Sequence, residues 1–171
     1  MHGLTGHRLP ELELPAATGE STGPVAPGAT WTVLYCHPGA HASGGPDHPP
    51  GWGEIPGAAG CTLESGTYRD RAAEFTARDA RAHGVSTQRP DQLSAFAEHA
   101  RLPFPLLSDG EVRPTAALRL PTFRAAGVDR LWRLTLVLDA TRTVRGVLCP
   151  VIDPAGSVED ALALIDGLAP Q

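Results

Sequence analysis

Lysine is missing from this sequence: all 14 basic residues are arginine, set against 19 acidic residues for a formal net charge of −5. The arginines are scattered among the acids and form no run. Proteins that bind nucleic acid or an anionic membrane usually concentrate their basic side chains in a patch. We therefore expect no nucleic acid and no membrane surface among the partners of this chain.

Long apolar segments are also missing. No stretch offers 18 unbroken apolar residues, so a membrane-spanning helix is not expected. The N-terminus begins MHGLTGHRLPELELP and has no cationic start followed by an apolar block, which is the pattern of a secretory signal. The sequence predicts a cytoplasmic protein.

Cysteine is scarce, with only Cys36, Cys61 and Cys149 at wide and irregular spacing. No CxxC pair occurs, and no spacing matches a zinc site. In a chain expected to be cytoplasmic, three such cysteines argue against a disulfide framework. Individual reactive thiols remain as the chemistry that these residues could supply.

The 171 residues suit one domain, and we expect a single unit over 1–171. Apolar and β-branched runs predict strands at 31–36, 82–87, 104–109, 131–139 and 143–150. Helical spacing predicts helices at 62–78, 90–101, 111–118 and 157–168, the last with Ser157 as its N-cap. The piece ELELP predicts a small N-terminal hairpin. This order of elements is typical of an α/β sandwich.

A segment dense in glycine and proline, 37–57, is predicted to be a long loop. It contains His37, His41, Asp47 and His48. Their spacing matches no metal motif, so we expect neither a metal ion nor another cofactor. Loops of this length in a compact domain are often functional, and the alternative is a lid that shapes a substrate pocket with Trp52 and Ile55.

Cys61 follows Gly60 at the start of the predicted helix 62–78. Only a thiolate is a good nucleophile, and unpaired N–H groups in the first turn of a helix favour an anion. Glycine before the cysteine permits a sharp turn and a close backbone approach. From these residues alone, Cys61 is either a reactive thiol or a buried, inert small side chain.

Arg133 interrupts the apolar strand LWRLTLVLD. Alternation places Arg133 on one face with Thr135 and Val137. Two interpretations are open: an edge residue that reaches solvent, or a guanidinium held beside an anionic site, where its fork of donors suits a thiolate and a peroxide oxygen.

Six runs in order, WTVLYCHPG, IPGAAGCTLESGTYRD, HGVSTQ, LPFPLLSD, LPTF and RLTLVLD, resemble the peroxiredoxins, most closely the Q-type or bacterioferritin-comigratory branch. The resemblance covers about residues 8 to 168. It implies a thioredoxin-like three-layer sandwich with an N-terminal β-hairpin and a long inserted loop before the active-site helix. It also implies a thiol-dependent peroxidase that reduces hydrogen peroxide or organic hydroperoxides.

The resemblance assigns Cys61 as the peroxidatic cysteine and Arg133 as the active-site arginine. The positions that it implies as lining the site are His37, Pro38, Gly60, Thr62 and Glu64. It implies a thiol reductant as partner, either a thioredoxin-like protein or a low-molecular-weight thiol, and a homodimer.

Two positions depart from the family pattern. Ala58 stands where the family has threonine, and Thr62 is a candidate to supply the missing hydroxyl. Gly66 stands where Q-type enzymes often have a resolving cysteine. Either Cys36 resolves the oxidised Cys61, or an external thiol does so in one-Cys chemistry; Cys149 is expected to be structural.

Two further functions stay open on the same scaffold. One is an enzyme diverted to a specific metabolite, with Cys61 as nucleophile or as acid/base group. The other is a redox sensor or binding module without turnover.

Overall fold

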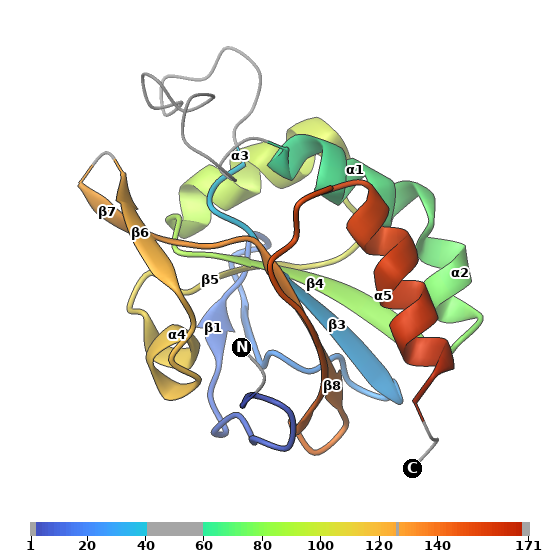
Figure 1. Ribbon diagram of the computed structural model, residues 1–171. Coiled ribbons are helices and arrows are strands. Elements are labelled where there is room, and N and C mark those ends of the chain that lie inside the picture. The colour runs from blue at the N-terminus through green and yellow to red at the C-terminus, as the bar shows by residue number, and fades with distance from the viewer. Residues whose placement is uncertain (1–2, 41–59, 126, 169–171) are drawn as a thin grey trace.

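The computed structural model describes residues 3–40, 60–125 and 127–168 (Figure 1). A five-stranded mixed sheet forms its centre, in the order β5-β4-β3-β8-β9. The strands are β3 (Trp31–Cys36), β4 (Ala80–Ser86), β5 (Leu106–Ser108), β8 (Leu134–Asp139) and β9 (Val144–Leu148). The first three are parallel, whereas β8 runs antiparallel to both β3 and β9. All five strands predicted from the sequence are present.

The helices are α1 (Cys61–Asp70), α2 (Ala72–Thr76), α3 (Pro90–Ala100), α4 (Arg113–Ala117) and α5 (Gly156–Asp166). The prediction of one helix over 62–78 is wrong, because the backbone leaves helical geometry at Arg71, with φ −106° and ψ 15°. The Arg71 guanidinium pairs there with Glu74 and with Glu159 of α5. Every helix in the described part of the chain is too short or too polar to cross a lipid bilayer.

Two smaller hairpins flank the sheet. β1 (Leu14–Pro15) pairs with β2 (Ser21–Thr22), which confirms the predicted N-terminal hairpin. β6 (Thr122–Ala125) pairs with β7 (Val128–Leu131) and was not predicted. Its strands are short, and half of their residues are exposed, so neither shows the apolar alternation of a buried strand.

The sheet has a different layer on each face. Helices α1, α2, α3 and α5 contribute side chains to one apolar cluster (Figure 1). The N-terminal residues, with Leu118 and Leu120 just after α4, belong to the cluster on the other face. Alternation along β3 divides its side chains accordingly: Val33 and Tyr35 belong to the helix-face cluster, and Leu34 and Cys36 to the other. This arrangement confirms the expected three-layer, thioredoxin-like fold.

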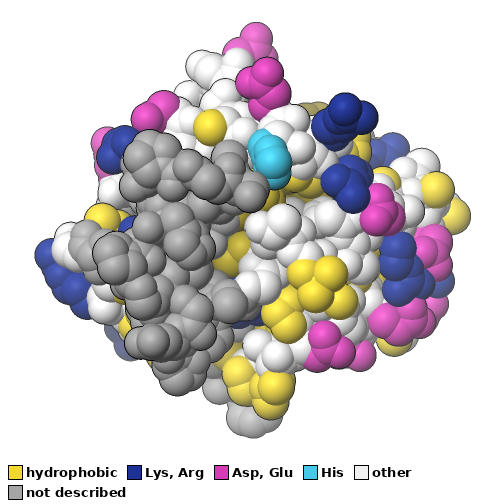
Figure 2. Space-filling view, turned by 90° about the horizontal axis from the view of Figure 1, so that it is seen from above, with side chains coloured by type: hydrophobic (Ala, Val, Ile, Leu, Met, Phe, Trp, Pro, Cys, Tyr) yellow, Lys and Arg dark blue, Asp and Glu magenta, His cyan; other side chains and the backbone are white. Residues whose placement is uncertain are grey.

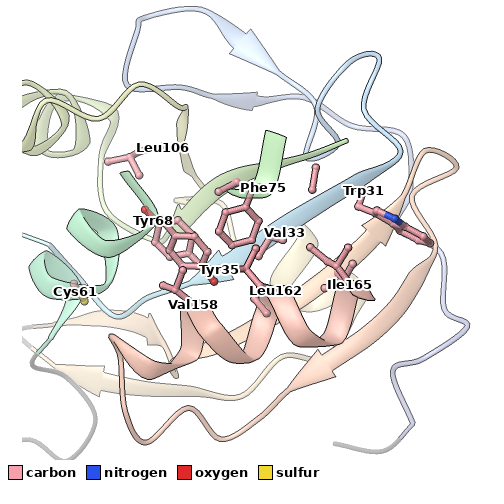
Figure 3. Packing of buried hydrophobic residues seen from close by; sticks show 14 of the residues in the cluster. Trp31, Val33, Tyr35, Cys61, Tyr68, Phe75, Leu106, Val158, Leu162 and Ile165 are labelled. Atoms are coloured by element: carbon pink, nitrogen blue, oxygen red, sulfur yellow. The ribbon is translucent and has the colours of Figure 1, made fainter. Parts of the chain in front are cut away.

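A row of buried aromatic rings connects β3 to α1 and α2 (Figure 3). The rings of Tyr35 and Tyr68 lie 4.5 Å apart at 13°, and those of Tyr68 and Phe75 lie 5.4 Å apart. The Tyr35 hydroxyl also hydrogen-bonds the Ser65 hydroxyl at 2.9 Å. Fully buried aromatic pairs of this kind are strong packing contacts. They fix α1 against the end of β3, and Cys61 lies at the same end of the cluster.

Candidate active site

Cys61 is the first residue of α1, where the sequence placed it, and only 3% of it is exposed. Gly60 before it has φ 107°, in the left-handed region. A β-carbon at Gly60 would meet Cγ of Pro154 at 2.6 Å, closer than real atoms approach. The predicted sharp turn is therefore confirmed, and only glycine fits there. The turn presents the thiol to the N-terminal, electropositive end of α1.

Arg133 reaches this thiol from a segment far along the chain. It lies at the bend just before β8, and its side chain points to the face shared by Thr135 and Val137. Its Nη2 atom donates to Sγ of Cys61 at 3.2 Å. The residue is only 3% exposed, which contradicts the alternative of an edge arginine reaching solvent.

Glu64 holds the other side of the guanidinium. Nη1 of Arg133 donates to Oε1 of Glu64 at 2.7 Å, with both side chains almost fully buried. Oε2 of Glu64 accepts from the Ser157 hydroxyl at 3.1 Å. A continuous chain of polar contacts therefore joins α5, α1 and the start of β8. Because two donors of the planar guanidinium are engaged at once, Arg133 is fixed in orientation toward Cys61.

Ser157 has a role in this chain that the sequence did not predict. Its assignment as the N-cap of the last helix is wrong, because that helix begins at Gly156 with Ala155 as the cap. The Ser157 hydroxyl lies 2.7 Å from the Pro154 carbonyl and 3.1 Å from Oε2 of Glu64, and its single proton is shared between these two acceptors. A serine at a helix start is normally assigned to capping, so the local pattern concealed the contact with Glu64.

Opposing effects act on the ionisation of Cys61. Burial raises the pKa of the thiol, and the Glu64 carboxylate raises it further. The Arg133 guanidinium, through its charge and its hydrogen bond, and the backbone N–H of Gly39 both lower that pKa. Burial also raises the pKa of Glu64, to about 7, against the lowering effects of Arg133 and Ser157. The net result is a Cys61 pKa above its ordinary value, so Arg133 and the Gly39 N–H offset only part of the effect of burial.

The other predicted lining residues take different places. His37 and Pro38 are buried directly after β3, and the His37 ring stacks on Tyr35 with centroids 5.6 Å apart. Thr62, the candidate to replace the family threonine, is exposed on α1. Ala58 and the predicted lid with its remaining histidines, Asp47, Trp52 and Ile55, lie outside the described residues.

The other two cysteines lie on the far face of the sheet from Cys61. Cys36 is fully buried in the second apolar cluster, and Cys149 packs against the same cluster. Burial raises the pKa of the Cys36 thiol far above its ordinary value. In this conformation Cys36 is separated from Cys61 by the sheet. Within 3–40, 60–125 and 127–168, no three potential metal-ligating side chains gather into a group.

Arg130 on β7 is a second guanidinium near the site that the sequence reasoning missed. It is 5% exposed; burial lowers its pKa, and the charge of Cys61 acts in the opposite direction. Arg130 and Arg133 are three positions apart, so strand alternation would place them on opposite faces of one strand. The chain instead bends between β7 and β8, and this bend could not be inferred from the residue spacing.

Figure 2 shows the molecule from above, the side on which α3 and the start of α1 lie in Figure 1. On the described part of this face, arginine and acidic side chains lie next to one another, and apolar side chains gather between them. Leu63 of α1 is 57% exposed, and Ile152, close in sequence to Pro154, is 89% exposed. The mixed charge matches the scattered arginines of the sequence.

Comparisons with known proteins agree with this geometry. The family model described as AhpC/TSA matches residues 55–147. A Mycobacterium tuberculosis protein named as a peroxiredoxin is 28% identical over 169 residues, which cover 94% of this chain and 95% of that protein. Peroxiredoxin Bcp of Escherichia coli is 30% identical over 91 residues, covering 52% of this chain and 58% of Bcp. The crystal structure of peroxidoxin BcpB from Mycobacterium tuberculosis has a TM-score of 0.76 at 27% identity, covering 96% of this chain and 97% of BcpB.

Proposed function

The chain belongs to the AhpC/TSA family and is a peroxiredoxin-type thiol peroxidase, and on that premise we propose that Cys61 is its peroxidatic nucleophile. The observation that carries the proposal is the 3.2 Å contact between Nη2 of Arg133 and Sγ of Cys61 at the N-terminus of α1. A nucleophilic thiol needs a neighbour that favours its thiolate, and this guanidinium is such a neighbour.

The reaction begins when the Cys61 thiolate attacks the terminal oxygen of a hydroperoxide. An S–O bond forms, the O–O bond breaks, and the cysteine is oxidised to a sulfenic acid. The leaving alkoxide or hydroxide takes a proton from water and departs as an alcohol or as water. Arg133 and the first N–H groups of α1 lie where negative charge develops, and donors fixed in advance stabilise such charge at little reorganisation cost.

We propose one-Cys chemistry for the return half of the cycle. Gly66 cannot form a disulfide, and Cys36 is buried in the cluster on the other face of the sheet. An external thiol then attacks the sulfenic acid, which releases water and leaves a mixed disulfide. A second thiol displaces Cys61 from that disulfide and restores the reduced enzyme. The homodimer implied by the family resemblance stays a prediction, which sedimentation analysis would test.

The test is peroxide consumption with dithiothreitol as the external thiol. We expect wild type and Cys149→Ser to consume hydrogen peroxide or cumene hydroperoxide, and Cys61→Ser to fall to the uncatalysed rate. Cys149→Ser is the matched control, because it removes the partly exposed thiol on the other side of the sheet. Equal rates for wild type and Cys61→Ser would overturn the proposal.

A further inference from the structure

The side-chain amide of Gln88 forms two hydrogen bonds with the backbone of Ala40. Its Oε1 atom accepts from the Ala40 N–H at 2.8 Å, and its Nε2 atom donates to the Ala40 carbonyl at 3.0 Å. Gln88 lies two residues beyond the end of β4 and is 2% exposed. A buried polar side chain that satisfies both backbone groups of one residue holds that residue in place.

Two serines hold Gln88 in turn. The Ser86 hydroxyl donates to Oε1 of Gln88 at 3.2 Å, and the Gln88 backbone N–H donates to the same hydroxyl. The Ser108 hydroxyl donates to the Gln88 carbonyl at 2.5 Å. The opposite amide orientation would place NH₂ against the Ala40 N–H and oxygen against its carbonyl. The network therefore specifies one orientation of the amide.

Ala40 is the sequence neighbour of Gly39, whose backbone N–H acts on the ionisation of the nucleophile. The backbone N–H of Gly39 lowers the pKa of the Cys61 thiol, and Gly39 is joined to Ala40 by a planar peptide. Ala40 itself belongs to the same buried cluster as Cys61. Glycine has no side chain to restrict its backbone, so its N–H needs an outside constraint to stay aimed at one atom. The bonds from Gln88 to Ala40 supply that constraint on the C-terminal side.

We propose that Gln88 is a positioning residue for Cys61: by fixing Ala40, it keeps the Gly39 N–H directed at the thiolate. The inference rests on the proposed function, because it concerns the reactivity of that cysteine. Gln88 touches no reacting atom and acts only through the backbone. A glutamine that merely filled the core would affect stability and leave the ionisation of Cys61 unchanged, so ionisation is the informative readout.

The experiment compares Gln88→Met with Gln92→Met. Methionine preserves length and volume and removes the amide without adding charge, which would itself disturb a thiolate. Gln92 lies four residues after Gln88, in the first turn of α3. Its side-chain oxygen accepts from the Arg89 N–H, and this hydrogen bond does not involve Ala40. The rate of Cys61 alkylation by iodoacetamide is followed against pH by peptide mass spectrometry, together with the rate constant for hydrogen peroxide.

In Gln88→Met we expect the midpoint of the alkylation profile to move to higher pH and both rates at pH 7 to fall roughly tenfold, the scale of one lost hydrogen bond to a charged group. Gln92→Met should keep the wild-type profile. An unchanged profile in Gln88→Met, or the same displacement in both variants, overturns the inference.

Gln88→Asn provides a second variant in case the methionine protein does not fold. Its amide is one methylene too short to reach Ala40, so the same displacement is expected, and a wild-type profile would also overturn the inference. Failure of the proposed function is a separate result, since it would appear as a wild-type Cys61 that alkylates normally and does not react with peroxide.

Discussion

Arg133 donates a hydrogen bond to Cys61 across 72 positions of sequence, with Nη2 and Sγ 3.2 Å apart. The same guanidinium binds Glu64 through Nη1 at 2.7 Å. The carboxylate prevents the guanidinium from turning away, and the guanidinium offsets part of the cost of burying the thiolate.

Replacing Arg133 by glutamine should slow the reaction with hydrogen peroxide by about 100-fold, on the scale of a lost charge-assisted contact in a buried site. The pKa of Cys61 should rise, because burial and Glu64 then act without the opposing guanidinium. Stopped-flow kinetics and iodoacetamide alkylation against pH measure the two effects.

The matched control for that variant is Arg78→Gln. Arg78 pairs with Asp166 on the surface, where an ion pair contributes little. It should leave both the peroxide rate and the alkylation profile unchanged. Wild-type kinetics in Arg133→Gln would contradict the role assigned to the arginine.

Glu64 should make stability depend on pH. Its pKa in the folded protein is about 7 because of burial, above the ordinary value of 4.5, so between these pH values the folded protein binds more protons than the unfolded chain. The stabilisation from this group is complete below about pH 4.5 and is lost as the pH rises to about 7. In Glu64→Gln the free energy of unfolding should fall less steeply across that window.

Urea titrations at several pH values measure this slope. Glu98→Gln, at an exposed position on α3, is the matched control. If Glu64→Gln and Glu98→Gln have the same slope between about pH 4.5 and 7, the titration assigned to Glu64 does not contribute.

Gly60→Ala should destabilise the protein and inactivate it. Alanine at φ 107° strains the backbone, and its β-carbon would meet Pro154 at 2.6 Å, which displaces the start of α1. Gly127→Ala provides the comparison, because Gly127 has φ 74° and no atom within 4 Å of an added β-carbon. It should lose only about 1–2 kcal/mol from backbone strain and keep its activity. Thermal unfolding and peroxide assays compare the two; equal losses in both would show that the Pro154 contact is unimportant.

Cys36→Ala should retain the peroxide reaction. The side chain lies in the cluster away from Cys61, so its loss leaves a small cavity on the other face of the sheet and no change at the site. Non-reducing peptide mapping after oxidation should show no Cys36–Cys61 disulfide in wild type. Such a disulfide, formed at the rate of peroxide consumption, would replace the one-Cys proposal with an internal resolving step.

Much of the fold was predictable because its signals are local. The run WTVLYC predicts β3 with the same bounds that the structure has, and Gly60 followed by a helical pattern places Cys61 at the start of α1. The break at Arg71 was not predictable, because the surrounding residues keep helical spacing and the partner Glu159 lies on a distant helix. Local propensity is a weak guide where a tertiary contact decides.

The site was predictable only in part for a similar reason. Cys61 and Arg133 stand out, one as a thiol at a helix start and the other as a charge in an apolar strand. Ser157 and Gln88 have ordinary local interpretations, a cap and a polar turn residue, and their contacts with Glu64 and Ala40 exist only after folding. The sequence also left open whether Cys36 lies near Cys61. The answer depends on the face of the sheet that each thiol occupies, and the two thiols belong to the clusters on opposite faces.

The most direct test of the central claim is mass spectrometry of wild-type protein treated with one equivalent of hydrogen peroxide in the presence of dimedone. Dimedone labels sulfenic acids, and tryptic mapping assigns the label to one of the three cysteines. The account predicts stoichiometric labelling of Cys61, with Cys36 and Cys149 unmodified. Labelling of another cysteine, or no labelling while peroxide disappears, would contradict it.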